Sequence, residues 1–203
     1  MSTVYNKGLR PEDKPRVVTS VVATASGTVS TAKNQPDVFH WRLYLVLAPD
    51  AKAASKSVLF DMSPTLPPKG TFIITSKSTD TSQAQRKTEL PLSTVGQHTV
   101  DQLIQLYLQK GMDRFNFDGE GMGCFYWTIT GVQHLEAAGM LKPGSHKALE
   151  DFYKGQAKLH PERFPLPIQR GAFYCVFIPR ARNGFGVNIE GGSGSKFGSV
   201  GRR

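Results

Sequence analysis

The apolar residues of this 203-residue chain follow two different periods, and the change falls near residue 99. Before it, short runs rich in β-branched and aromatic residues are separated by turn residues, which is typical of strands. We expect strands at about residues 17–29, 38–47, 56–62 and 71–76, and an edge strand at 88–92. The segment 38–47 is the most apolar of them and the most clearly predicted strand.

After residue 99 the apolar residues recur every three or four positions, as on one face of a helix. Thr99 and Gln102 have the spacing of a capping box, and Gly111 is a typical helix end. Two more helices are expected at residues 124–138 and 145–159, followed by a last strand at 171–178. Strands followed by helices predict an α+β domain, with the helices packed on one side of a mostly antiparallel sheet.

The two ends of the chain differ in composition from the middle. Residues 1–16 are polar and contain two prolines, so we expect a flexible N-terminal segment without the pattern of a secretory signal. Residues 182–203 are rich in glycine and basic residues, which predicts a flexible tail after a single domain at 17–181. No apolar run approaches the roughly 20 residues of a membrane helix. We therefore expect a cytoplasmic protein with no membrane span.

The chain carries 25 Lys and Arg residues against 16 Asp and Glu residues, a formal net charge of +9. This charge suits a polyanionic partner such as RNA, but it is equally explained by solubility and a basic tail. The aromatic signature of an RNA-recognition domain is absent. The sequence contains no metal-ligand spacing, phosphate loop or dinucleotide motif, so we expect no metal and no cofactor. The sequence leaves the oligomeric state open.

Cys124 ends a glycine-rich segment and begins a predicted helix. Three alternating glycines, the last of them Gly123, allow backbone amides to approach a ligand closely. The free N–H groups and the dipole at a helix start favour a thiolate and can stabilise an oxyanion. The alternative is a buried, inert cysteine, because three aromatic residues follow it. For Cys175, in the middle of the last predicted strand, we favour this interpretation as a core residue.

His40 opens the most apolar strand, where an imidazole needs a hydrogen-bond partner or a function. With Cys124 it would form the general base and nucleophile of an acyl-transfer site; alone, it would be a structural histidine. Asp61 interrupts the strand at 56–62 and is our first candidate for orienting the ring, although it would also serve as a turn cap. Glu120 is the second candidate.

Several neighbours of these residues are expected to contact a substrate. Trp41 follows His40, and Gly123 and Tyr126 flank the cysteine. Asp118 and Glu120 lie just before the predicted helix, where they would either cap it or pair with a cationic group of the substrate.

The order of these motifs resembles the permuted papain-like proteins of the lecithin retinol acyltransferase type. In that family a His-Trp pair begins a strand, a second polar residue follows on another strand, and a cysteine opens a later helix. Here these elements are His40 with Trp41, Asp61, and Gly123 with Cys124. Asp61 stands where that family usually has a histidine. The resemblance implies a permuted papain-like fold with a cysteine nucleophile.

Residues 38–139 also resemble a widespread fungal family described only as a domain of unknown function, most clearly at 110–117 and 119–127. In size and basic charge the chain is similar to fungal arginine-containing cyclodipeptide synthases, which use aminoacyl-tRNA. We therefore predict a cysteine-dependent acyltransferase, most specifically a cyclodipeptide synthase of fungal secondary metabolism with aminoacyl-tRNA as partner. The alternatives are a thiol hydrolase or transferase acting on a lipid, peptide or carrier-bound acyl group, and a non-catalytic binding module.

Overall fold

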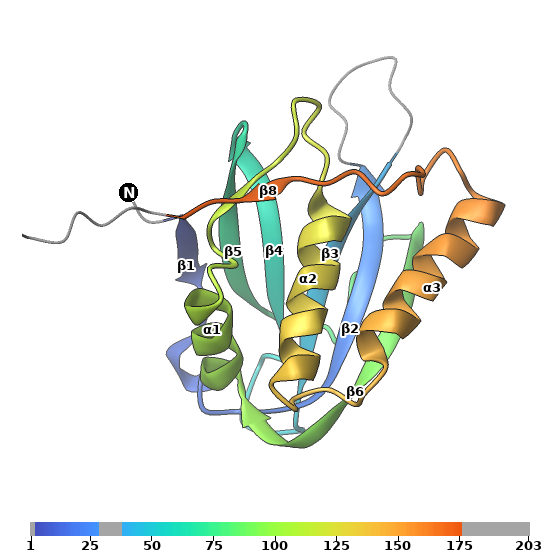
Figure 1. The fold of residues 1–203 in the computed structure, drawn as a ribbon. Coiled ribbons are helices and arrows are strands. Elements are labelled where there is room, and N and C mark those ends of the chain that lie inside the picture. The colour runs from blue at the N-terminus through green and yellow to red at the C-terminus, as the bar shows by residue number, and fades with distance from the viewer. Residues whose placement is uncertain (1–2, 29–37, 176–203) are drawn as a thin grey trace, which may run out of the picture.

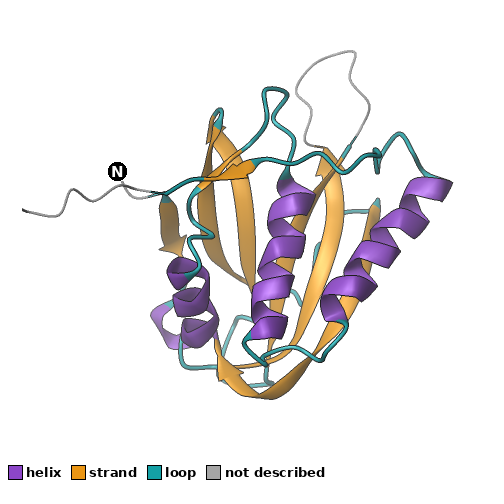
Figure 2. Cartoon of the chain, viewed as in Figure 1, coloured by secondary structure: helices purple, strands orange, loops and turns teal. Residues whose placement is uncertain are grey.

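The computed structural model describes residues 3–28 and 38–175, which fold into one sheet covered by helices (Figures 1 and 2). In this part of the chain the strands are β1 (Val4–Gly8), β2 (Val17–Thr28), β3 (Phe39–Leu47), β4 (Ser57–Leu66), β5 (Lys69–Lys77), β6 (Lys87–Thr99), β7 (Phe115–Asn116) and β8 (Ala172–Phe173). The helices are α1 (Val100–Gln109), α2 (Cys124–Ala137) and α3 (Ser145–Leu159), with a 3-10 turn, η1, at Pro11–Asp13.

The eight strands form a single curled sheet in the order β6-β2-β3-β4-β5-β7-β8, and β1 pairs with β5. Each pairing is antiparallel except that of β1 with β5, which is parallel. All three helices lie on one face of the sheet, with α2 between α1 and α3 (Figure 1). The predicted α+β fold, with a mostly antiparallel sheet and helices on one side, is thus confirmed.

The core lies between the helices and the sheet. Alternate residues of β3, including Trp41 and Leu43, are buried in the main apolar cluster together with Val132 and Leu135 of α2. The residues between them face the other side of the sheet, since side chains alternate along a strand. Tyr44 packs there in a second, smaller apolar cluster. Both faces of β3 are therefore buried.

The second face of the sheet is covered by the polar segment 78–86. The Ser57 hydroxyl donates to the backbone oxygen of Thr79 at 2.6 Å, and the Ser26 and Ser82 hydroxyls are 3.2 Å apart. These bonds join the segment to β4 and β2, so it shields this face from water.

The first 16 residues are the clearest departure from the sequence prediction. They were expected to be flexible, yet they carry β1 and η1. Asp13 is fully buried; it accepts hydrogen bonds from Arg16 at 3.0 Å and Ser76 at 2.6 Å. Arg16 also donates to the backbone oxygens of Ala48 and Ser55. Ser76, Ala48 and Ser55 are distant in the chain from the residues that they bind. The polar composition of the segment does not reveal such contacts, so it wrongly predicted flexibility.

The C-terminal strand is also shorter than predicted. Only Ala172–Phe173 form β8, and Cys175 is exposed, so the prediction that this cysteine is a core residue is wrong. Residues 176–178 and the predicted tail at 182–203 lie outside the described residues. At the opposite sheet edge, β6 is longer than the expected 88–92 and runs directly into α1.

Two helical glycines give opposite predictions for the same substitution. A methyl group on Gly131 of α2 would lie against the hydroxyl and ring of Tyr107, whereas one on Gly155 of α3 would meet no atom within 4 Å. Alanine gains up to about 1 kcal/mol of helix propensity, and overpacking a core costs about 1–3 kcal/mol. We expect Gly155→Ala to raise and Gly131→Ala to lower the free energy of unfolding in urea. Equal stabilisation by both would contradict the packing of α1 against α2.

Candidate active site

The loop before α2 delivers Cys124 to the first position of the helix. Asp118 shapes this loop: its Oδ1 accepts hydrogen bonds from the backbone N–H groups of Glu120 at 3.0 Å and Met122 at 2.7 Å. Gly123 then caps the helix with a φ of 132°, a conformation that favours glycine. A side chain on Gly123 would also approach the backbone nitrogen of Gly171 to 2.9 Å. The glycine is thus required to bring the cysteine into place.

His40 and Asp61 meet where the sheet divides. The ladder between β3 and β4 ends at the pair Leu43 and Phe60, while β3 remains paired with β2 and β4 with β5. Beyond this point His40 Nε2 lies 2.6 Å from Asp61 Oδ1, so a side-chain bond joins the strands in place of the backbone ladder. Both residues are buried.

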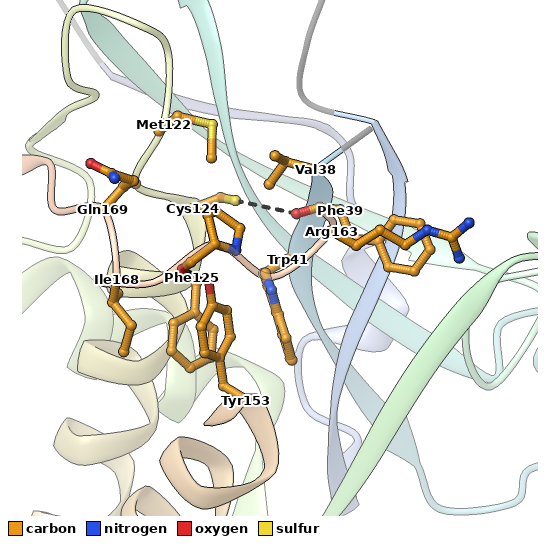
Figure 3. Close-up of a pocket in the computed structure, with 12 residues that line it drawn as sticks. Val38, Phe39, Trp41, Met122, Cys124, Phe125, Tyr153, Arg163, Ile168 and Gln169 are labelled. Atoms are coloured by element: carbon orange, nitrogen blue, oxygen red, sulfur yellow. Dashed lines mark hydrogen bonds between the residues drawn. The ribbon is translucent and has the colours of Figure 1, made fainter. Parts of the chain in front are cut away.

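The helix start brings Cys124 to the same point from the other side. Its Sγ lies 3.9 Å from the backbone oxygen of Phe39, the residue before His40 (Figure 3). Cys124 is also among the groups that raise the pKa of His40, so its sulfur lies close to the ring. Because Nε2 is bonded to Asp61, Nδ1 is the nitrogen left for the sulfur. The structure therefore brings Cys124, His40 and Asp61 together in the order expected of a catalytic triad.

The charges of this group support one another. Burial opposes a charged ring, but the charge and hydrogen bond of Asp61, followed by those of Cys124, outweigh it and raise the pKa of His40 to about 9. Burial also disfavours an ionised Asp61, yet His40 and then Arg42 lower the pKa of this carboxyl group below its usual value. At neutral pH the pair is thus an imidazolium and a carboxylate.

Arg42 is a site residue that the sequence analysis missed. Its Nε donates to Asp61 Oδ2 at 3.2 Å, and its NH1 donates to the backbone oxygen of Ser26 at 3.2 Å. Arg42 therefore fixes the Asp61 carboxylate, which in turn binds the His40 ring. Strand alternation provided a signal, because Arg42 follows His40 by two positions and so shares its face of β3.

A small pocket, with a cavity volume of about 20 Å³, opens at Cys124 (Figure 3). Its lining residues are Val38, Phe39, Trp41, Met122, Gly123, Cys124, Phe125, Tyr153, Arg163, Pro165, Ile168 and Gln169. Of the predicted substrate contacts, Trp41 and Gly123 are among them. Most of the lining is apolar, and its polar side chains include those of Tyr153, Arg163 and Gln169. Burial and then the charge of Cys124 raise the pKa of Tyr153, as expected for a phenol beside this sulfur.

The other predicted substrate contacts lie elsewhere. The carboxylate of Asp118 is engaged by its own loop, and Glu120 is exposed on that loop. Neither residue lines the pocket. Tyr126 lines a separate depression, where the Arg170 guanidinium lies 5.5 Å from the centre of its ring. The structure thus brings these three residues together neither with the triad nor with its pocket.

Two further properties concern all of the described residues. Among residues 3–28 and 38–175, no group of three or more His, Cys, Asp and Glu side chains is arranged to hold a metal ion. Within the same ranges, no helix has the length and apolar character needed to cross a membrane.

Comparison with known proteins gives one match. The model of a family described as a domain of unknown function (DUF7770) covers residues 19–174, which include the triad and the whole pocket lining. No curated protein and no solved structure matches the chain.

The raised pKa of His40 predicts how stability depends on pH. A ring with a folded pKa of about 9, against an ordinary value of 6.5, stabilises the fold fully below about pH 6.5. This contribution, up to about 3 kcal/mol, is lost as the pH rises through 9. We expect His40→Gln to flatten the fall in the free energy of urea unfolding between pH 6.5 and 9.5, while the exposed-site control His160→Gln retains it. If the free energy of unfolding falls equally with pH in His40→Gln and in the unaltered protein, the pKa of His40 is not raised in the folded state.

Proposed function

This chain belongs to the DUF7770 family, and we propose that it is a cysteine-dependent acyltransferase or thiol hydrolase. The observation that carries the proposal is the meeting of Cys124, His40 and Asp61, from α2, β3 and β4, beside a pocket that Cys124 lines. A buried set of ionisable groups is costly to fold, and such groups cluster at functional sites.

In the first half of the reaction, the Cys124 thiolate attacks the carbonyl carbon of an acyl donor. The carbonyl oxygen becomes an oxyanion beside the first turn of α2, whose N–H groups have no partner within the helix. When the tetrahedral intermediate collapses, the bond to the leaving group breaks and that group takes the proton from His40. The product is a thioester on Cys124.

In the second half, His40 removes a proton from the acceptor, which is water, an alcohol or an amine. The acceptor attacks the thioester carbon, and the intermediate expels the Cys124 thiolate. The thiolate then lies beside the protonated His40, as it did before the reaction. Asp61 keeps Nε2 bonded throughout, so Nδ1 faces the sulfur and the reacting atoms. Arg42 holds the other oxygen of this carboxylate.

The identity of the acyl donor remains a prediction. Aminoacyl-tRNA as donor and a cyclodipeptide as product are not favoured by the pocket lining, which includes no carboxylate among the described residues to bind an arginyl group. The alternative class, a non-catalytic binding module, would use the same pocket without an activated sulfur. The two classes differ in the reactivity of Cys124.

The two cysteines provide a direct test of this activation. Cys124 is only 3% exposed, whereas Cys175 is exposed, so accessibility alone predicts faster alkylation of Cys175. We expect iodoacetamide at neutral pH to label Cys124 first, because a thiolate reacts and a thiol does not. Peptide mapping of the labelled protein at successive times measures both rates. His40→Gln should slow labelling at Cys124 and leave Cys175 unchanged. Faster labelling of Cys175 in the unaltered protein would contradict an activated Cys124.

The acyl intermediate itself can be trapped. With p-nitrophenyl acetate, we expect intact-mass analysis to show one acetyl group, located on Cys124. His40→Gln should reduce the rate of acetylation by about 10²–10⁴-fold, which is the usual contribution of a general acid–base. Cys175→Ala is the matched control and should acylate at the normal rate. An acetyl group elsewhere, or equal rates in His40→Gln, would overturn the mechanism.

A further inference from the structure

A second pocket adjoins the pocket of Cys124. It lies between the start of β6 and the end of α3, and it shares Phe39 and Arg163 with the thiol pocket. The Arg163 guanidinium lies 5.1 Å from the centre of the Phe39 ring, so this pair forms the boundary between the two cavities. In Figure 3 the Arg163 side chain extends over Phe39 and away from Cys124.

The lining of this second pocket is basic. Its residues are Phe39, Gln85, Arg86, Lys87, Thr88, Gln156, His160, Arg163 and Phe164. Two carboxylates lie beside it without lining it. Glu162 is 3.6 Å from Arg163 and 3.8 Å from His160, and Glu89 is 3.1 Å from Lys87. Arginine and lysine charges still exceed these acidic charges, and the glutamine amides add neutral donors. We call the residues Arg86, Lys87, His160 and Arg163 the basic rim.

We propose that the basic rim binds an anionic group, phosphate or carboxylate, on the substrate whose acyl group reaches Cys124. This inference rests on the proposed function and names the substrate class of the same site. The substrate would extend across Phe39, with its acyl group in the apolar pocket and its charged end at the rim.

The contrast between the two cavities supports this arrangement. The thiol pocket is lined mainly by apolar side chains, which suit an acyl group. In the second pocket Gln85, Arg86 and Lys87 are exposed. An anion bound there therefore keeps part of its hydration. Guanidinium groups bind phosphate and carboxylate with two parallel hydrogen bonds. A basic cleft also raises the local concentration of anions before they bind.

Two alkylating agents that differ in charge test the rim without a known substrate. Iodoacetate is an anion and iodoacetamide is neutral, and both modify cysteine. The measured quantity is the ratio of the two labelling rates at Cys124. Because the charged His40 ring also attracts an anion, the comparison between variants decides the question. We expect Arg86→Gln, which changes no residue of the thiol pocket, to lower the iodoacetate to iodoacetamide ratio about 3-fold, with little change in the iodoacetamide rate. Lys87 is left in place because its Nζ donates to Thr81 and Ser82.

A matched control removes the same charge elsewhere. Lys52→Gln also lowers the net charge by one at an exposed position outside both pockets, and it should leave the ratio unchanged. Competition by sodium phosphate or by sodium acetate, at equal ionic strength, then separates the two kinds of anion. Stronger protection against iodoacetate by phosphate indicates a phosphate-bearing substrate, and stronger protection by acetate indicates a carboxylate.

The failure of this inference is distinct from the failure of the proposed function. If Cys124 reacts slowly with both reagents, the proposed nucleophile is wrong. If Cys124 reacts rapidly with iodoacetamide but the ratio is the same in the rim and control variants, the thiol site stands and the anion site is overturned. Absence of protection by either anion would likewise overturn it.

Discussion

The hydrogen bond between His40 and Asp61 is the interaction on which the arrangement of the site depends. Strand alternation places both side chains on the face of the sheet opposite the helices, whereas Cys124 begins a helix on the other face. The sulfur meets the ring only because β3 and β4 separate beyond Leu43 and Phe60. An open ladder leaves backbone groups without strand partners, which is costly in a buried region. The His40–Asp61 bond, reinforced by Arg42, joins the two strands where the ladder has ended.

The parts of this molecule that were predicted from sequence rest on local signals. The strand at 38–47 and the helix after Thr99 have clear apolar periods, and the capping box is present with bonds of 2.9 and 3.4 Å. Cys124 was predicted at a helix start because Gly123 precedes an apolar helical pattern, and α2 begins there. His40 was singled out because an imidazole at the start of an apolar strand is unusual. Each inference needed only neighbours within a few residues.

The parts that were not predicted depend on contacts between distant segments. Arg42 was overlooked because its role depends on the position of β4 against β3. Strand alternation places Arg42 on the face of His40 but does not show that Asp61 lies within its reach. β1 is short and polar, and its alignment on β5 follows from Asp13 bonding Ser76, 63 positions away. Asp118 was predicted either to cap the helix or to contact a substrate, and its carboxylate accepts hydrogen bonds from two backbone N–H groups of its own loop. Short acidic side chains near helix starts bind either a ligand or the backbone of their own loop, and composition does not distinguish these two roles.

The third helix carries none of the predicted catalytic residues, yet it fixes the wall of the pocket. Tyr153 of α3 stacks on Phe125 with ring centres 4.0 Å apart, and Phe125 contacts Trp41 at 4.8 Å. The Tyr153 hydroxyl donates to the backbone oxygen of Pro165 at 2.8 Å, which ties α3 to the segment that carries Gln169. Burial raises the pKa of this phenol, so it keeps the proton that the bond requires. The aromatic stack thus aligns α2, β3 and the pocket wall on the helix side of the sheet.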